Sequence, residues 1–442
     1  MIIPSRKRPF EASEDAVFPT LPAPPVLAHR TAGFLKLIIT PKEHDPSVRA
    51  ALSNIPRHTE YFRVLSGELG SRTWHHINSI PDEVKALDLS YPVLLPRQRC
   101  WKGRSSPLAK DILAACKAQA LSKKYIIESG GQRLQDARLG DVLRELVSPP
   151  TEKPQVAHNI VMEGLEELNA STIPLSHLRP HPETALHYSM NITPQNTIID
   201  IHIDQGATGL SIGLGSPEDD ETLLVHKVWF FWPPSEHNLN LFEDLRQSMP
   251  GRGLCLARSQ SLEHGIVASA GIHEGVVLPP GWLHATITTN GGFLGGVTYD
   301  LPCNFHMVSS IFAMDMRLDV SSFPEKAPLF TNALREFLTY TCDAQQKMDA
   351  IDAWFEVEEA LKRAELNARM KRNNGTCMRL LAAWKLGRFE LVEEDECVAC
   401  GWNTNRGGTF GEHFWREHLR IVMAAGCKMR YRKGQSRRNT SR

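Results

Sequence analysis

The sequence predicts an α+β protein with a β-sandwich or barrel at its centre, and two patterns indicate this. Short β-rich runs follow one another closely after about residue 175, separated by turn clusters of Gly, Pro and Asn. On both sides of that block, apolar residues recur at intervals of three and four, as in amphipathic helices. The 442 residues are too many for one ordinary domain and suit two or three.

The β-rich block contains six runs that we expect to form strands. They are NTIIDIHID (196–204), TGLSIGLG (208–215), KVWFFWPP (227–234), GVVLPPGW (275–282), HATITT (284–289) and FLGGVTYD (293–300). SPEDDE (216–221) reads as a solvated hairpin loop. We expect the aromatic run Trp229 to Trp232 to be strand core rather than a methyl-lysine cage. His237 and Asn238, in the turn after it, are expected to be structural.

The flanking regions read differently from the β-rich block. The Pro- and Ala-rich N-terminus is expected to be disordered. The region after it is mixed, with helical periodicity at 108–121 and 134–147 and no catalytic motif. The helical pattern returns after about 310, most clearly at 352–372, which carries Glu/Lys/Arg pairs at helical spacing. The expected parts are therefore a disordered end (1–30), a mixed region (31–170), the β-rich domain (171–310), a helical region (311–392), a Cys/His segment (393–426) and a basic tail (427–442).

A histidine and an aspartate two residues apart form the first candidate site. In a strand alternate side chains face the same side, so His202 and Asp204 are expected to project together while the isoleucines beside them face a core. His284 follows the Pro/Gly turn of PPGWLH (279–284) and is expected to start a neighbouring strand. Two histidines and one carboxylate leave open positions on a divalent metal, as in the facial triad of non-heme Fe(II) oxygenases. The alternative is a buried structural His/Asp set without metal.

The segments around these residues resemble the JmjC domain of Fe(II)/2-oxoglutarate oxygenases. The resemblance rests on HIDQGATG (202–209), HKVWFFWPPSEHNLNLFEDL (226–245) and VVLPPGWLHA (276–285), in this order and spacing, followed by the GG pair at 295–296. It covers residues from about 188 to 300 and is closest to the JmjC lysine demethylases that accompany PHD fingers or F-boxes. It implies a double-stranded β-helix core, a cupin-like jelly roll, with flanking helical regions.

The resemblance also implies roles for individual residues. His202, Asp204 and His284 match the iron ligands, and Lys227 matches the lysine that pairs with the distal carboxylate of 2-oxoglutarate. The implied reaction is oxidation of a C–H bond in a protein substrate. On an N-methyl group such as that of a histone lysine, hydroxylation releases formaldehyde and demethylates.

Three places depart from the family pattern: Ile199, the stretch Gly213-Leu214-Gly215, which has no aromatic or polar residue to support the cofactor, and Val297, where some relatives have asparagine. Close relatives have a threonine three residues before the first histidine, where this chain has Ile199. Thr197, two residues earlier on the same strand face, is the candidate substitute for binding the cofactor. Two alternatives to the demethylase therefore stay open. One is a catalytically inactive JmjC-like chromatin-binding protein, and the other is a protein hydroxylase on the same scaffold.

A second metal motif lies near the C-terminus. Cys397 and Cys400 are followed, twelve residues on, by His413 and His418, which is the spacing of a C₂H₂ zinc finger. Two thiolates from a turn and two imidazoles from a helix give tetrahedral zinc. The alternative is chance spacing in a helical tail. The finger is expected to dock on chromatin or protein, with DNA contact as a further role.

The charge distribution bears on location and partners. Net charge is zero, but both ends are basic, with Arg6-Lys7-Arg8 at one end and seven Arg/Lys residues and no acid in 428–442. Such ends suit nucleic acid or a nuclear-import receptor, and a solvated disordered end is the alternative. No apolar run is long enough for a membrane span, and the N-terminus has no secretory signal. We therefore expect a nuclear protein with Fe(II), 2-oxoglutarate and Zn(II) as cofactors and a histone or other chromatin protein as partner. The sequence leaves the oligomeric state open.

Overall fold

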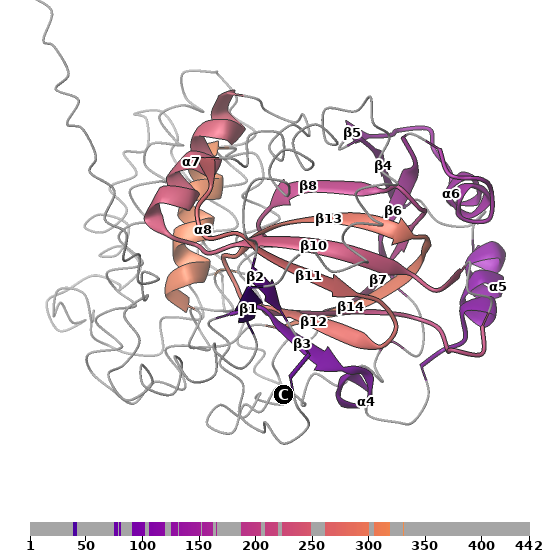
Figure 1. Cartoon of the computed structure of the whole chain (residues 1–442). Coiled ribbons are helices and arrows are strands. Elements are labelled where there is room, and N and C mark those ends of the chain that lie inside the picture. Colours follow the sequence, from indigo (N-terminus) through magenta and orange to yellow (C-terminus); the bar gives the residue numbers. More distant parts are fainter. Residues whose placement is uncertain are drawn as a thin grey trace, which may run out of the picture. The chain divides into compact units, whose positions relative to one another are not determined.

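Figure 1 shows the computed structural model of the chain. The structure describes Ile39–Pro41, Phe330 and most of residues 75–318; the gaps within that range are 78, 81–90, 102–105, 120–124, 131, 152, 162–164, 166–186, 205–207, 220–222, 249–260 and 300–304. The chain divides into two compact units, Met1–Phe312 and Ala313–Arg442, and nearly all described residues belong to the first. The expected disordered N-terminus, the zinc finger (393–426), the basic tail (427–442) and most of the helical region (311–392) lie outside the described residues.

Two sheets of mainly antiparallel strands build the first unit (Figure 1). The six-stranded sheet has the order β1 (Ile39–Pro41), β2 (His75–Ile77), β11 (Ile266–Ala270), β10 (His226–Trp232), β13 (Leu283–Asn290) and β8 (Ile198–His202). The eight-stranded sheet has the order β3 (Val93–Pro96), β12 (Glu274–Leu278), β9 (Thr208–Gly213), β14 (Gly292–Tyr299), β7 (His187–Thr193), β6 (Gln155–Ile160), β4 (Ile126–Ser129) and β5 (Gln132–Arg133). Among these pairings, β11 with β2 is parallel.

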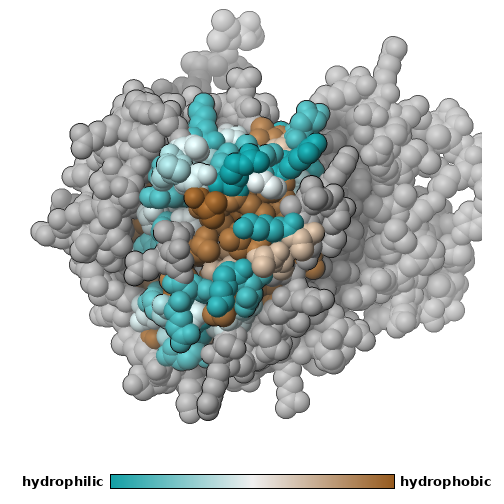
Figure 2. Space-filling model, turned by 90° about the vertical axis from the view of Figure 1, so that its right-hand side faces the viewer, coloured by the Kyte–Doolittle hydropathy of each residue, from teal (hydrophilic) through white to brown (hydrophobic). Residues whose placement is uncertain are grey.

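Five described helices accompany the sheets. They are α4 (Arg97–Cys100), α5 (Ala109–Gln119), α6 (Leu139–Leu146), α7 (Glu236–Ser248) and α8 (Phe305–Leu318). In α6 the buried residues recur at intervals of three and four, which gives one apolar face: Leu139, Val142, Leu143 and Leu146. That face packs with α5 against the outer side of the eight-stranded sheet. Figure 2 views this side and shows an apolar area surrounded by hydrophilic residues. None of the described helices is both long and apolar enough to span a membrane.

A hydrophobic cluster joins the facing sides of the two sheets. Trp229 and Phe231 of β10 contribute from the six-stranded sheet, and Val276, Leu278 and Leu294 contribute from the other. Because side chains alternate along a strand, the odd-numbered residues of β10 point into the space between the sheets. Lys227, the second residue of β10, has the same parity and is 2% exposed. Its ammonium therefore lies in the interior, between the sheets.

The α+β class is as expected, and all six predicted runs contain strands (β8, β9, β10, β12, β13 and β14). The helices expected at 108–121 and 134–147 are present as α5 and the shorter α6. The SEHNLNLF segment, expected to be a turn, begins helix α7.

The structure does not separate the mixed region (31–170) from the β-rich domain (171–310). That region contributes strands as well as helices: β3 pairs with β12, and β6 pairs with β7. These strands are two to six residues long, so they gave no periodic signal, and their pairing partners lie far along the chain. β7 and β11 were also missed.

Candidate metal centre

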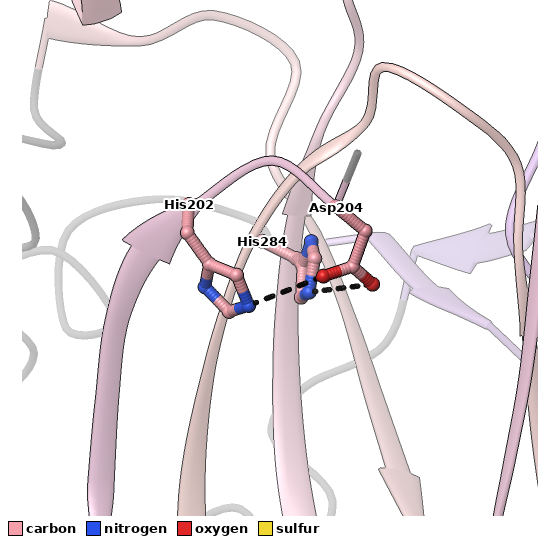
Figure 3. Close-up of side chains that lie close together, drawn as sticks. All are labelled: His202, Asp204 and His284. Carbon is pink, nitrogen blue, oxygen red and sulfur yellow. Dashed lines mark ion pairs between the residues drawn. The ribbon is translucent and has the colours of Figure 1, made fainter. Parts of the chain in front are cut away.

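His202, Asp204 and His284 converge on one point (Figure 3). Nε2 of His202 lies 3.6 Å from Oδ1 of Asp204, and Nε2 of His284 lies 3.7 Å from Oδ2 of the same carboxylate. One potential ligand atom from each of the three residues lies within 4.8 Å of the other two. Two ligands at right angles on a shared metal, each about 2.1 Å from it, are separated by about 3 Å. The group is therefore close to the geometry that a bound metal ion requires and could hold one.

Two neighbouring strands and a loop supply these residues. His202 is the last residue of β8, and His284, the second residue of β13, is its register partner. His284 thus begins a strand as the sequence predicts. Asp204 lies two residues beyond the end of β8, in the loop that curves over the site, and not on the strand as expected (Figure 3). The carboxylate is brought to the histidines by this loop rather than by strand alternation.

A β-bulge in β8 aims the first histidine. Thr286 pairs with Ile199 and His284 pairs with His202, so three steps along β8 match two along β13. The extra residue frees the N–H of Ile201 from the ladder, and the Asp200 carboxylate accepts a hydrogen bond from it at 2.8 Å. The bulge brings Ile199 and His202, three residues apart, to the same face of the sheet. The Asp200 side chain therefore supports the bulge that lies directly before His202.

Backbone carbonyls orient both imidazole rings. Nδ1 of His202 lies 2.8 Å from the carbonyl oxygen of Asp200, and Nδ1 of His284 lies 3.1 Å from that of Trp282. A carbonyl only accepts hydrogen bonds, so each Nδ1 carries a hydrogen, and the Nε2 of each ring faces the Asp204 carboxylate. Burial, with the neighbouring His202, lowers the pKa of His284 to about 4. A neutral ring with a free Nε2 is the form in which histidine binds a metal.

Exposure differs across the site. The side chain of His284 is 3% exposed, whereas those of His202 and Asp204 are 36% and 45% exposed. An ion bound by these three groups would be buried on the sheet side and open to solvent on the other. Open coordination positions distinguish catalytic metal sites from closed structural ones.

Lys227 is as buried as His284, each with 2% exposure, and lies on the same face of the six-stranded sheet. Burial lowers the pKa of its ammonium to about 7. Among the described residues, no carboxylate forms an ion pair with it. Lys227 pairs with Thr288 in register, and Phe231 of the same strand pairs with His284. Four residues at about 3.3 Å each separate these two pairs, so about 13 Å of strand lies between the lysine and the metal ligand. An anion held between Lys227 and a metal would lie along this interval, beside Trp229 and Thr286.

Two threonine hydroxyls face this interval, and the sequence did not indicate them. Thr286 and Thr288 are two and four residues after His284 and therefore share its buried face on β13. Their exposures are 3% and 0%. Neither hydroxyl has a hydrogen-bond partner among the described residues. Alternation on β13 could have shown that they share a face with His284, but not which residues pair with them across the sheet.

Thr197 behaves differently from these threonines. Its hydroxyl donates a 2.7 Å hydrogen bond to the carbonyl of Pro194. Its proton is therefore already committed, and the cofactor-binding role expected for Thr197 is not supported by this contact. Ile199, at the position where the resemblance to JmjC domains implies a threonine, pairs directly with Thr286.

His158, from the opposite sheet, is a further polar group that the sequence did not indicate. The pairs Ala157–Ile192 and Ile160–Met190 show a second bulge, in β6, where Asn159 has the left-handed φ of 56°. Nε2 of His158 lies 3.7 Å from Oε2 of Glu128. Burial, together with the charges of Lys227 and His202, lowers the pKa of His158 to about 4. His158 thus borders the same interior space as those two residues.

The other residues singled out in this block are structural, as predicted. Asn238 is fully buried; its amide donates to the carbonyls of Pro233 (2.9 Å) and Glu263 (3.1 Å) and accepts from the N–H of Glu263 (2.9 Å). His237 lies 2.9 Å from the carbonyl of Ser261. The aromatic residues from Trp229 to Trp232 are all buried, with 6% exposure or less, so the run is strand core.

Comparison with known proteins gives no family for this chain. No model of a protein family matches it, and a search of curated proteins found no significant match. The argument for function therefore depends on the residues of the site and their surroundings.

Proposed function

We propose that this protein is a JmjC-type Fe(II)/2-oxoglutarate-dependent dioxygenase acting on a protein substrate. One observation carries the proposal. Two imidazoles and a carboxylate converge at a solvent-facing rim, and a buried lysine without a carboxylate partner among the described residues lies on the same face of the sheet as His284. Two histidines and one carboxylate suit iron with open positions. A buried ammonium suits an anion that enters from outside the chain.

The order of the strands supports a jelly-roll core. From β7 to β14, four strands have the order β11-β10-β13-β8 in one sheet and four have the order β12-β9-β14-β7 in the other. A jelly roll is a double sheet of eight antiparallel strands connected as two Greek keys, and this order is compatible with it. Cupins share that architecture, and the resemblance to JmjC domains implies it here.

Each residue would have a defined part in the reaction. The Nε2 atoms of His202 and His284 and the Asp204 carboxylate would hold iron. The Lys227 ammonium would neutralise the distal carboxylate of 2-oxoglutarate in the buried space. When bound, iron and 2-oxoglutarate would supply the oxidising power of O₂ for hydroxylation of a C–H bond, with 2-oxoglutarate converted to succinate and CO₂. The packed aromatic wall of β10 keeps water from the inner side, and the exposed side of His202 and Asp204 is where a substrate side chain would approach.

The resemblance extends the proposal to substrate and location. A methylated histone lysine is the first substrate to test, in the nucleus, with the zinc-finger motif and the basic ends as chromatin contacts. Protein hydroxylation on the same scaffold is the alternative reaction. Ile199, where relatives have threonine, favours a second candidate, a chromatin-binding protein that keeps the metal site without turnover.

Succinate release tests the proposal directly. Purified protein with Fe(II), 2-oxoglutarate, ascorbate and methylated histone peptides should release succinate, and His202→Ala should abolish that release. His273→Ala is the matched control, because His273 is exposed and lies outside the site. Formaldehyde accompanying succinate would identify demethylation, and succinate without formaldehyde would identify hydroxylation. Succinate release that His202→Ala leaves unchanged would refute the assignment, and no release by the wild-type protein would favour the noncatalytic candidate.

A further inference from the structure

Three hydrogen-bond donors lie together on the inner face of the six-stranded sheet. Lys227 on β10 pairs with Thr288 on β13, and Thr286 is the next inward-facing residue of β13 toward His284. All three are buried, with exposures of 2%, 0% and 3% in that order. The described residues provide neither a carboxylate for the ammonium nor a hydrogen-bond partner for either hydroxyl.

Burying these three donors destabilises the fold unless a hydrogen-bond acceptor binds to them. Buried hydroxyls in native proteins are nearly always hydrogen-bonded, and leaving one unpaired destabilises the fold. A buried ammonium without a counter-ion is more unfavourable still. A carboxylate has two oxygens with about four lone-pair sites, and it would neutralise the ammonium and accept from both hydroxyls. The three donors therefore match the needs of one carboxylate.

We propose that Thr286 and Thr288 are the hydroxyl donors of the dicarboxylate site, together with Lys227. They replace the hydroxyl that relatives supply from the position of Ile199. This inference rests on the proposed function, because it names the residues that bind the cosubstrate of that reaction.

The register of the sheet shows how the replacement works. Ile199 is the direct partner of Thr286, and the bulge in β8 turns Ile199 toward the same face as His202. Directly paired residues of antiparallel strands have Cα atoms about 4.5–5.5 Å apart. A hydroxyl lost from position 199 can therefore be supplied from the facing residue, and the bound carboxylate shifts by only a few ångströms.

Thr197 does not serve this role. Its hydroxyl proton is used in the 2.7 Å hydrogen bond to Pro194, and a carboxylate requires donors. Thr289 offers a second contrast on the strand that carries both proposed donors. Its hydroxyl donates to the carbonyl of His226 at 3.1 Å and lies 2.6 Å from Nδ1 of the same residue.

Valine substitutions distinguish the two proposed donors from the other threonines by two measurements, the Kd for 2-oxoglutarate and the thermal midpoint of the ligand-free protein. Thr286→Val and Thr288→Val remove a hydroxyl and keep the branched shape. We would titrate 2-oxoglutarate into the metal-loaded full-length protein by calorimetry, with Mn(II) in place of iron to prevent turnover. Loss of a hydrogen bond to a charged group should raise the Kd about tenfold to a hundredfold. In the ligand-free protein the same substitutions should leave the thermal midpoint unchanged or raise it, because an unpaired buried hydroxyl is removed.

Thr289→Val and Thr197→Val are the controls. Each loses an existing hydrogen bond, so each should lower the thermal midpoint while changing the Kd by less than about threefold. Wild-type affinity in Thr286→Val and Thr288→Val, or a clear fall in their thermal midpoints, would overturn the inference and leave the proposed function intact. Failure of the metal-loaded wild-type protein to bind 2-oxoglutarate would overturn both.

Discussion

The buried ammonium of Lys227 should destabilise the ligand-free protein, and Lys227→Met should therefore stabilise it. Methionine has a similar length, carries no charge and fits an interior between two sheets. Burial lowers the lysine pKa from 10.5 to about 7, and each unit corresponds to about 1.36 kcal/mol. The shift in the lysine pKa therefore corresponds to a loss of about 4 kcal/mol in the free energy of unfolding at pH 7. This value is an upper limit because the folded chain can relax around the ammonium.

The pH dependence of this effect follows from the direction of the pKa shift. The unfolded lysine keeps its proton up to about pH 10.5, whereas the folded lysine releases it above about pH 7. Between these values the unfolded state binds more protons, so the stability of the wild-type protein rises with pH. The advantage of Lys227→Met should therefore be largest at pH 7 and below, and it should shrink by about 1.4 kcal/mol per pH unit above that.

Urea denaturation followed by tryptophan fluorescence, at pH 6, 7, 8 and 9 without metal or dicarboxylate, measures this difference. Lys227→Arg is the matched control, because arginine stays protonated and should be no more stable than lysine at any of these pH values. A Lys227→Met protein that is less stable than wild type at pH 7 would show that the ammonium already has a counter-ion. A stability difference that does not vary with pH would refute the assigned cause.

Three further predictions concern the surroundings of the site. Asn238→Ala should lower the free energy of unfolding by about 2–4 kcal/mol, because it removes three hydrogen bonds that the buried amide makes with the backbone of Pro233 and Glu263; an unchanged urea midpoint would contradict this. Gly281→Ala should cost about 1–2 kcal/mol or more in thermal denaturation, since φ is +83° there and a Cβ would meet the side chain of Met307; a variant as stable as wild type would show that the turn relaxes freely. Ile199→Thr should lower the KM for 2-oxoglutarate by about fivefold to tenfold, since it adds a donor opposite Thr286; an unchanged KM would mean that position 199 does not face the cofactor.

The candidate metal ligands could be predicted from the sequence because their signal is local. A histidine at the end of an apolar strand and a second histidine after a Pro/Gly turn are short patterns, and the structure brings both to one point. The strands of the β-rich block were found for the same reason. Asp204 was expected to reach the site by strand alternation. The strand ends at His202, and the loop that follows it brings Asp204 to the histidines instead.

The surroundings of the ligands could not be predicted because they depend on pairing between distant strands. Thr288 faces Lys227 only through the register of β13 with β10. His158 reaches the same space through a bulge that no composition pattern reveals, in a region that showed only helical periodicity. Thr197 was chosen because it is near Ile199 in the sequence, whereas the hydroxyls that face the site come from the neighbouring strand.

The bulge in β8 also limits which changes in chain length this strand can accept. Substitutions at Asp200 or Ile201 keep the number of residues between Ile199 and His202, so they leave the first ligand pointing inward. Deletion of one residue there would restore regular alternation and turn either Ile199 or His202 to the other side of the sheet. Insertions and deletions in residues 198–202 should therefore be far more damaging than point substitutions, and natural variants of this strand should differ in residue type but not in length.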